Sequence, residues 1–297
     1  MKIIVTGSLG HISKPLTQAL VQKGHKVTVI SSKADKQKDI ETLGASAAIG
    51  SINDVAFCAQ TFTGANVVYL MEPPVNYFDK EADLEKHWTD IANSYVQAIQ
   101  QSGVTKVIHL SSIGAHTDKG VGMLAAHHDV ENILSALPKN VSIKFMRPVG
   151  FYYNMFAFIP AIKKANAIIQ NYGGGEKEPW VSPLDIATVI AEEVETAFNG
   201  RTVRYVVSDE VSPNEVAKIL GEAIGNPDLQ WMAIPDEQFL NNLITVGFNA
   251  KAAKGLTEMN IGRRNNLYDD YKQNKPTLGK VKLVDFAKDF AATFNVQ

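Results

Sequence analysis

Glycine and hydroxyl side chains follow the first apolar run of the chain, which begins MKIIVTGSLGHIS. Gly7, Gly10 and Ser13 have the spacing G-x-x-G-x-x-S, between a β-branched run and a segment with helical periodicity. A glycine at the first position allows a sharp turn, and one at the second lets a ligand approach the backbone closely. A helix N-terminus behind such a turn directs N–H groups at an anion. The pattern predicts a site for the pyrophosphate of a dinucleotide, although a purely structural turn would have the same pattern.

The side chains that end the second apolar run indicate which dinucleotide would bind. An acidic residue at this position holds the ribose hydroxyls of NAD. Here the run ends Ile30-Ser31-Ser32-Lys33, and the first carboxylate comes at Asp35. Two hydroxyls and an ammonium group suit the 2′-phosphate of NADP(H), which a carboxylate would repel. NADP(H) is therefore the preferred cofactor. NAD(H) stays an alternative for two reasons. Asp35 could hold the ribose hydroxyls, and Lys33 and Lys36 could be solvated loop charges that contact no phosphate.

Alternating strand-like and helix-like segments would hold these turns in place. The predicted strands of the first half are residues 2–5, 26–30, 46–49, 66–71, 106–111 and 142–146, and the clearest helices are 14–24, 84–101 and 124–137. This alternation predicts an α/β fold, a doubly wound parallel sheet of Rossmann type with helices on both faces. Ligands of such sheets bind beyond the carboxyl ends of the strands. We assign residues 1–150 to an NADP-binding Rossmann domain.

The alternation becomes less regular after Arg147-Pro148. An aromatic segment covers 151–162, and residues 179–185 are interpreted as the lead into a helix over 186–198. A seventh strand is predicted at 203–207, with further helices at 212–224 and 282–294. Residues 228–275 follow no α/β rhythm and are predicted to form a smaller, mainly helical lobe. Residues 151–297 are thus expected to complete the sheet and to form the substrate-binding lobe, mainly through 228–275.

The composition limits the classes of partner. The 29 basic and 31 acidic residues nearly balance, so nothing favours a nucleic acid or an anionic membrane. The apolar runs are shorter than the roughly 20 residues that a membrane helix needs. Cys58 is the one cysteine, which excludes an intrachain disulfide and favours a cytoplasmic setting, with Met1 beginning the mature fold. The expected partner is a small-molecule substrate, and homo-oligomerisation stays open.

Short motifs occur in a fixed order along most of the chain. They are Thr6 to Ile12, His109-Leu110-Ser111-Ser112, His127 to Glu131, Arg147-Pro148 with Phe151 and Asn154, Trp180-Val181 with Asp185 to Ala187, and Thr277-Leu278-Gly279. Through their order and spacing the chain resembles the NmrA-like group of atypical short-chain dehydrogenases/reductases. That group includes NADPH-dependent quinone and azo reductases as well as redox-sensing regulators.

The resemblance implies a set of cofactor contacts. The first turn, with Gly7, Ser8, Gly10, His11 and Ile12, would line the pyrophosphate. The end of the second strand, with Ser31, Ser32 and Lys33, would face the adenosine phosphate. Met71, Glu72 and Pro73 would pass near the nicotinamide ribose, and the set is completed by Ser111, His128 and Pro148.

One helix departs from the pattern of typical short-chain dehydrogenases, which carry a Tyr-x-x-x-Lys pair. Here the aligned stretch runs from Leu124 to His128, with leucine in place of the tyrosine and His128 in place of the lysine. Leucine cannot transfer a proton, so alcohol–ketone chemistry by that route and sugar-nucleotide epimerisation are not expected. Hydride transfer to a quinone, an azo bond or an electron-poor alkene does not need that tyrosine, because placement of the reactants contributes much of the catalysis.

Three residues are candidates for the polar steps of such a reaction. Ser111 would hydrogen-bond a developing oxyanion or the nicotinamide amide. His128 would contact the ribose or supply a proton, although a partly buried helix histidine is an equal alternative. The third candidate is a tyrosine, either Tyr152 or Tyr153, in the role of the missing acid. The substrate, expected to be flat and apolar, would contact Phe151, Tyr152, Tyr153 and Asn154, although aromatic runs are often simply core.

A metal site is not expected from the adjacent histidines. Neighbours on a helix point about 100° apart, so His127 and His128 cannot chelate one ion. Only His127 and Glu131 share a face, which gives two ligands. The resulting hypothesis is a cytoplasmic oxidoreductase, an NADPH-dependent reductase of a quinone-like or other electron-poor small molecule. The alternative is a non-catalytic NADP(H)-binding redox sensor of the NmrA type.

Overall fold

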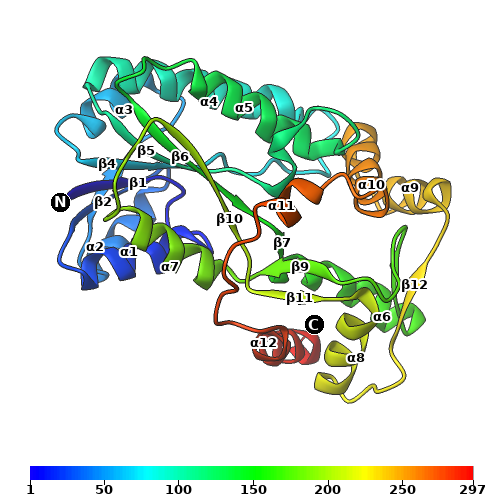
Figure 1. Cartoon of the computed structure of the whole chain (residues 1–297). Helices are drawn as coiled ribbons and strands as arrows, with labels where there is room; N and C mark the ends of the chain where they lie inside the picture. The colour runs from blue at the N-terminus through cyan, green and yellow to red at the C-terminus, as the bar shows by residue number, and fades with distance from the viewer. Residues whose placement is uncertain (297) are drawn as a thin grey trace.

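A large parallel sheet with helices on both faces forms one part of the molecule, and small sheets with further helices form the other (Figure 1). The computed structural model describes residues 1–296. The strands of the large sheet are β1 (Lys2–Val5), β2 (Lys26–Ser31), β3 (Ser46–Ile49), β4 (Val67–Leu70), β5 (Lys106–Leu110), β6 (Ser142–Pro148) and β10 (Arg201–Val206).

The strand order of this sheet is β10-β6-β5-β4-β1-β2-β3, with all neighbours parallel. The chain runs outward from β1 to β3 and then returns to place β4 on the other side of β1, so the strand order reverses between β1 and β4. Each of the seven predicted strands overlaps a strand of this sheet. The prediction of a doubly wound Rossmann-type fold is therefore confirmed, and ligands of such folds bind at the point of reversal.

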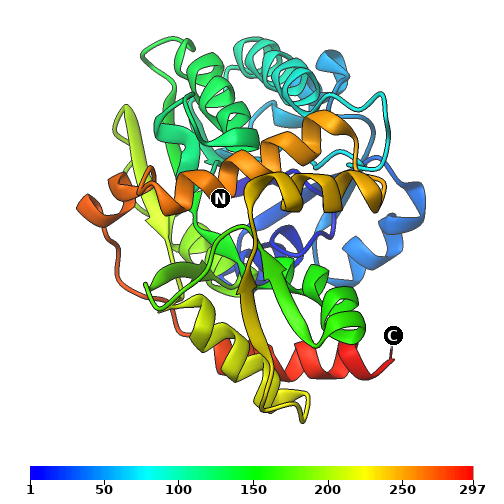
Figure 2. The same ribbon diagram turned by 90° about the vertical axis from the view of Figure 1, so that its right-hand side faces the viewer.

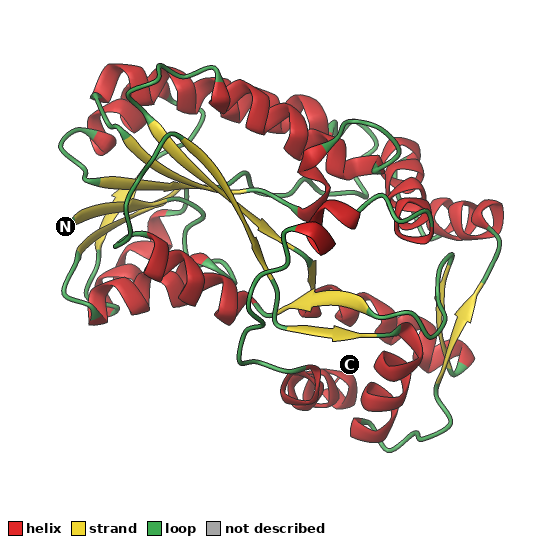
Figure 3. Ribbon diagram, viewed as in Figure 1, coloured by secondary structure: helices red, strands yellow, loops and turns green. Residues whose placement is uncertain are grey.

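Apolar residues on both sides of each central strand explain why the sheet is covered twice. On one face, Ile3, Val5 and Tyr69 pack with α1 (Ser13–Gln22) and α7 (Pro183–Glu193). On the other face, Ile4, Val68 and Leu70 pack with three helices, α3 (Val55–Phe62), α4 (Leu84–Ser102) and α5 (Ala125–Ser135). Figure 3 shows the two helical layers above and below the strands. Shorter elements of this part are α2 (Gln37–Thr42) and the 3₁₀ turns η1 (Ala34–Lys36), η2 (Ile113–His116) and η3 (Gly122–Leu124).

The second part has its own core and two small sheets. One sheet has the order β11 (Asp209–Val211), β9 (Glu178–Val181), β7 (Gly150–Phe151), and the other pairs β12 (Gln230–Ala233) with β8 (Ala167–Gln170). Tyr152, Trp180, Trp231 and Phe286 belong to its buried core. Its helices are η4 (Tyr152–Phe158), α6 (Ile159–Ala165), α8 (Pro213–Ala223), α9 (Asp236–Thr245), α10 (Ala250–Arg264), α11 (Asp269–Gln273) and α12 (Leu283–Val296). Figure 2 shows α9 and α10 running across one side of the molecule.

The second part contains two strands, β9 and β12, that the sequence did not predict. Residues 179–181 belong to β9, which leads through Ser182 directly into α7, and the region 228–275 contains β12 besides α9, α10 and α11. Both strands are short and pair with partners distant in sequence, such as Gln230 opposite Ala167. Such pairing leaves little local periodicity to detect. Among residues 1–296, no helix has both the length and the apolar character needed to cross a membrane.

Candidate functional site

The glycine turn lies at the carboxyl end of β1, at the point where the strand order reverses. Gly7 has φ +86° and Ser8 φ +53°, and the Gly10 N–H donates to the Gly7 carbonyl at 3.1 Å. A Cβ on Gly7 would lie 2.6 Å from Ser13 Oγ and 2.9 Å from Met71 Sδ. Glycine is therefore required both by its backbone conformation and by the space around it. Helix α1 begins directly behind the turn, at Ser13.

Hydroxyl groups connect this turn to the end of β2. Ser8 Oγ donates to Ser31 Oγ at 2.9 Å, and the Ser31 oxygen accepts from the Lys33 N–H at 3.2 Å. Ser31 is buried, whereas Ser32 and Lys33 are exposed. The structure thus brings together two of the predicted contact groups, the pyrophosphate turn and the adenosine-phosphate residues. These residues fit a dinucleotide, since a turn without a Cβ lies beside a strand end that carries hydroxyls and an ammonium group.

The segment after β4 is fixed to its neighbours by three hydrogen bonds. The Met71 N–H donates to Thr6 Oγ1 at 2.9 Å, and its carbonyl accepts from the Tyr95 hydroxyl at 2.8 Å. Trp88 Nε1 donates to the Pro73 carbonyl at 2.8 Å. Met71 also contacts the glycine turn, so this predicted nicotinamide-ribose segment lies beside the predicted pyrophosphate turn.

Ser111 belongs to a buried ionic network at the end of β5. Its hydroxyl donates to Glu131 Oε1 at 2.5 Å, and Arg147 Nε and Nη2 bind the two oxygens of the same carboxylate at 2.9 and 2.7 Å. Burial disfavours the charge of Arg147, but Glu131 and then Tyr205 raise the pKa of its guanidinium above the ordinary value. In this structure the Ser111 hydroxyl hydrogen is therefore donated to Glu131 and not to a ligand. Pro148, the next predicted cofactor contact, is buried at the end of β6.

The start of α5 presents the residues that replace the tyrosine–lysine pair. Leu124 packs against Gly114, where a Cβ would lie 2.6 Å from the leucine Cβ. His128 is partly exposed, and its ring Nδ1 lies 3.2 Å from Asn132 Nδ2 on the same helix. The histidine is therefore turned along its own helix in this structure. Contact with a ribose would require the ring to leave Asn132.

The aromatic segment after β6 divides between two environments. Tyr153 stacks on His11 of the glycine turn, with ring centroids 4.8 Å apart, and Phe151 lies 5.2 Å from Tyr153. Tyr152 instead stacks on Phe286 in the core of the second part, where its hydroxyl donates to the Val281 carbonyl at 3.4 Å. Burial, and then nearby carboxylates, raise the pKa of Tyr152 well above its ordinary value. Asn154 is exposed. Phe151 and Tyr153 thus lie at the turn, and Tyr152 does not.

A buried ionisable cluster lies behind the β4 segment, and it includes Glu72, whose side chain is directed to His109. His109 Nε2 and Glu72 Oε2 are 2.9 Å apart, and their side chains are 0% and 1% exposed. His127 packs against Trp88 beside this pair. The signal that could have revealed it is His109 itself, an ionisable side chain inside the apolar strand Lys106–Leu110. Within residues 1–296, no group of three or more His, Cys, Asp or Glu side chains is arranged to hold a metal ion.

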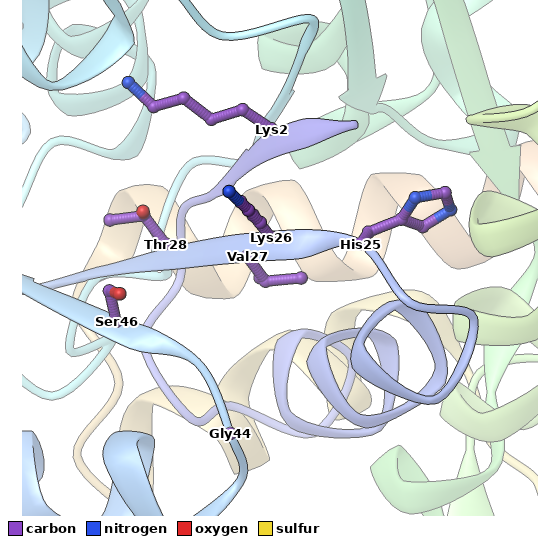
Figure 4. A pocket seen from close by; sticks show the side chains of 7 residues that line it. All are labelled: Lys2, His25, Lys26, Val27, Thr28, Gly44 and Ser46. Carbon is purple, nitrogen blue, oxygen red and sulfur yellow. The ribbon is translucent and has the colours of Figure 1, made fainter.

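The described surface has hollows at both edges of the sheet. One, of about 270 Å³, has apolar walls that include Val75, Leu84, Met123 and Ala126, and it lies between the β4–α4 segment, the start of α5 and α10. The other, of about 340 Å³, lies among Lys2, Lys26 and Ser46, the first residues of β1, β2 and β3 (Figure 4). This second hollow is at the amino edge of the sheet, opposite the glycine turn.

The parallel sheet and the glycine turn at its point of reversal define a Rossmann-type α/β protein with a dinucleotide-type turn. The chain belongs to the NmrA-like family, whose model matches residues 1–288, as the ordered motifs predict. No curated protein sequence matches the chain significantly.

Solved structures with the same fold are similar over nearly the whole chain. An NADPH-dependent quinone oxidoreductase from Escherichia coli, in complex with NADPH, has a TM-score of 0.80 at 18% identity, covering 97% of this chain and 99% of that one. A triphenylmethane reductase from Citrobacter sp., in complex with NADP(H), has a TM-score of 0.75 at 19% identity, with coverage of 97% and 99%. A nucleoside-diphosphate-sugar epimerase from Staphylococcus aureus has a TM-score of 0.77 at 17% identity, with coverage of 97% and 100%.

Proposed function

We propose that this chain binds NADP(H) and reduces a quinone-like or other electron-poor small molecule. The observation that carries the proposal is the link from the glycine turn to the end of β2, through Ser8, Ser31 and Lys33. When bound, the nucleotide supplies a hydride. The glycine turn would hold its pyrophosphate, Ser32 and Lys33 its 2′-phosphate, and Met71 to Pro73 its nicotinamide ribose. His128 and Pro148 would complete the contacts.

The class of acceptor follows from the missing general acid. Leu124 occupies the tyrosine position and packs on Gly114, and the Tyr152 hydroxyl is directed to Val281. The chain therefore favours an acceptor that takes up hydride at a stabilised position and receives its proton from water or a weak acid. Quinones, azo bonds and enones have this property. Reduction of a simple ketone would need a placed proton donor.

The surroundings of the glycine turn support a flat substrate. Tyr153 stacks on His11, and Phe151 is tilted beside Tyr153. A planar acceptor would pack favourably against these rings. Separately, helix α10 covers the 270 Å³ hollow at the start of α5, where apolar residues such as Leu84 and Met123 lie beside charged ones such as Lys254 and Glu258. The similar proteins from Escherichia coli and Citrobacter are a quinone oxidoreductase and a dye reductase, which agrees with this class of acceptor.

The test is oxidation of NADPH by the purified protein, followed by absorbance, with quinones, azo and triphenylmethane dyes, and enones as acceptors. We expect turnover with NADPH that exceeds turnover with NADH. His128→Ala should lower kcat/KM about tenfold, the effect of one lost hydrogen bond to a bound group. His87→Ala, on α4, is the matched control and should leave the rate unchanged. Tight NADPH binding without turnover on any acceptor would instead assign the chain to the redox sensors.

A further inference from the structure

The Glu72–His109 pair joins the end of β4 to the neighbouring strand β5. Glu72 directly follows Met71, whose side chain contacts the glycine turn, and His109 belongs to β5. The pair is fully enclosed, between the sheet and the α4 and α5 helices. Phe145 of β6 packs edge-on against the His109 ring, with centroids 5.8 Å apart.

Several polar atoms of this cluster are unsatisfied. Glu72 Oε1, His109 Nδ1 and His127 Nδ1 are buried and find no hydrogen-bond partner among residues 1–296. Most buried polar groups in folded proteins are hydrogen-bonded, so each exception calls for an explanation. Buried ionisable groups beside a ligand crevice are typical of functional sites.

The groups that surround the pair are uncharged near neutral pH. Burial, and then Glu72, raise the pKa of Tyr95 on α4 well above the ordinary range, and they do the same for Tyr69, which lies on the opposite face of β4. Burial, and then Asp54, raise the pKa of Cys58 on α3 to about 11. Burial, and then His109, lower the pKa of His127 on α5 to about 3.

Helix α5 also presents the charged Glu131 to this cluster, and Glu131 is neutralised by an ion pair. The Glu131 carboxylate is paired with Arg147 of β6 at 2.7 Å. The net charge of this buried region therefore depends on the number of protons that Glu72 and His109 hold between them. With one shared proton the pair is neutral, and without it the pair carries one negative charge.

We propose that the Glu72–His109 pair is a buried proton-binding site that is coupled to the oxidation state of the bound nucleotide. The inference rests on the proposed function, because it takes Met71 to Pro73 as the nicotinamide-ribose segment. The oxidised nicotinamide ring is positive and the reduced ring is neutral. A negative pair stabilises the positive ring in a poorly solvated site, so binding of the oxidised nucleotide releases one proton to solvent. Release of that nucleotide lets the pair take the proton up again, and no electrons move in either step.

The experiment measures the dissociation constants of NADP⁺ and NADPH between pH 6 and pH 9. Both nucleotides carry the 2′-phosphate, so its titration affects both dissociation constants equally and does not change their ratio. In the unmodified protein we expect NADP⁺ to gain affinity relative to NADPH as pH rises, by up to about tenfold per pH unit where one proton is linked. Calorimetry in two buffers of different ionisation enthalpy should show proton release with NADP⁺ and not with NADPH.

Glu72→Gln removes the carboxyl group of the pair at nearly constant shape and should abolish the pH dependence of the ratio. His109→Gln tests the other partner, and Glu81→Gln on the exposed β4–α4 segment is the matched control that should keep the dependence. A pH-independent ratio in the unmodified protein would overturn the inference, as would a dependence that persists in a folded Glu72→Gln or His109→Gln variant. Failure of both nucleotides to bind would overturn the proposed function itself, and the inference with it.

Discussion

Lys33 is the residue that most directly tests which nucleotide binds. It follows Ser31, whose oxygen accepts the Lys33 N–H, and its side chain is exposed at the end of β2. Lys33→Glu replaces an attraction to a 2′-phosphate by a repulsion, and a hydrogen bond to a charged group contributes about 1.5–3 kcal/mol. We expect NADPH to bind at least about tenfold more weakly, with little change for NADH. Nucleotide fluorescence titrations measure both affinities.

Lys38→Glu is the control for that variant, because Lys38 is also exposed but lies on α2, beyond η1. It should leave the ratio of the two affinities unchanged. Equal weakening of NADPH and NADH by Lys33→Glu would contradict the 2′-phosphate assignment.

At the scale of single residues, the sequence predicts residue types better than side-chain directions. Tyr152 and Tyr153 are neighbours, yet one packs on Phe286 and the other on His11. They begin η4, a 3₁₀ helix in which consecutive side chains point about a third of a turn apart. Only the position of that helix between the two parts of the molecule decides which tyrosine reaches the glycine turn. The glycine turn itself was predictable because Gly7 needs its conformation locally.

At the scale of elements, the Arg147–Glu131 pair ties α5 to β6. The two side chains are only 9% and 10% exposed, and Ser111 and Tyr205 bind the same network. Arg147→Met would leave the buried Glu131 carboxylate uncompensated, which costs about 3–5 kcal/mol. We expect the free energy of unfolding in urea to fall by that amount.

The matched control is Lys86→Met, which breaks the exposed Lys86–Asp90 pair within α4. Surface pairs contribute at most about 1 kcal/mol, so this variant should unfold almost as the unmodified protein does. A similar loss in the free energy of unfolding for both variants would show that the buried Arg147 network contributes no more to stability than an exposed ion pair.

Element type was predictable wherever a run of apolar residues is long enough to be buried on both sides, as in β1 and β4. The two-residue β7 and the proline-containing β9 have no such run. They are strands because β9 lies between β7 and β11, which is a property of the assembled second part and not of local sequence.

At the scale of the whole molecule, α10 is held against the Rossmann part by a close backbone contact. A Cβ on Gly122 of η3 would lie 2.0 Å from the Gly255 carbonyl oxygen and 2.6 Å from the Met259 nitrogen. Gly122→Ala must therefore move α10 away, and such overpacking costs about 1–3 kcal/mol. We expect a lower Tm and faster amide exchange in α10.

Gly64→Ala is the control, since Gly64 also has a positive φ (+70°) but nothing within 4 Å of its Cβ position. Its loss of stability should reflect backbone strain alone and leave amide exchange in α10 unchanged. Comparable exchange in both variants would mean that the contact does not fix α10.

Strand β10 joins the sheet at its edge, beside β6, although more than fifty residues separate the two along the chain. During synthesis on a ribosome, β6 emerges with one edge unpaired. This edge stays unpaired until Arg201 to Val206 have been synthesised and can form β10. Bare strand edges readily pair with other chains. A nascent polypeptide of this protein therefore avoids aggregation through this edge only if chaperones cover the edge or if synthesis reaches β10 quickly. A fragment of residues 1–150, the Rossmann domain as assigned from the sequence, would lack β10, so the edge of β6 would stay unpaired.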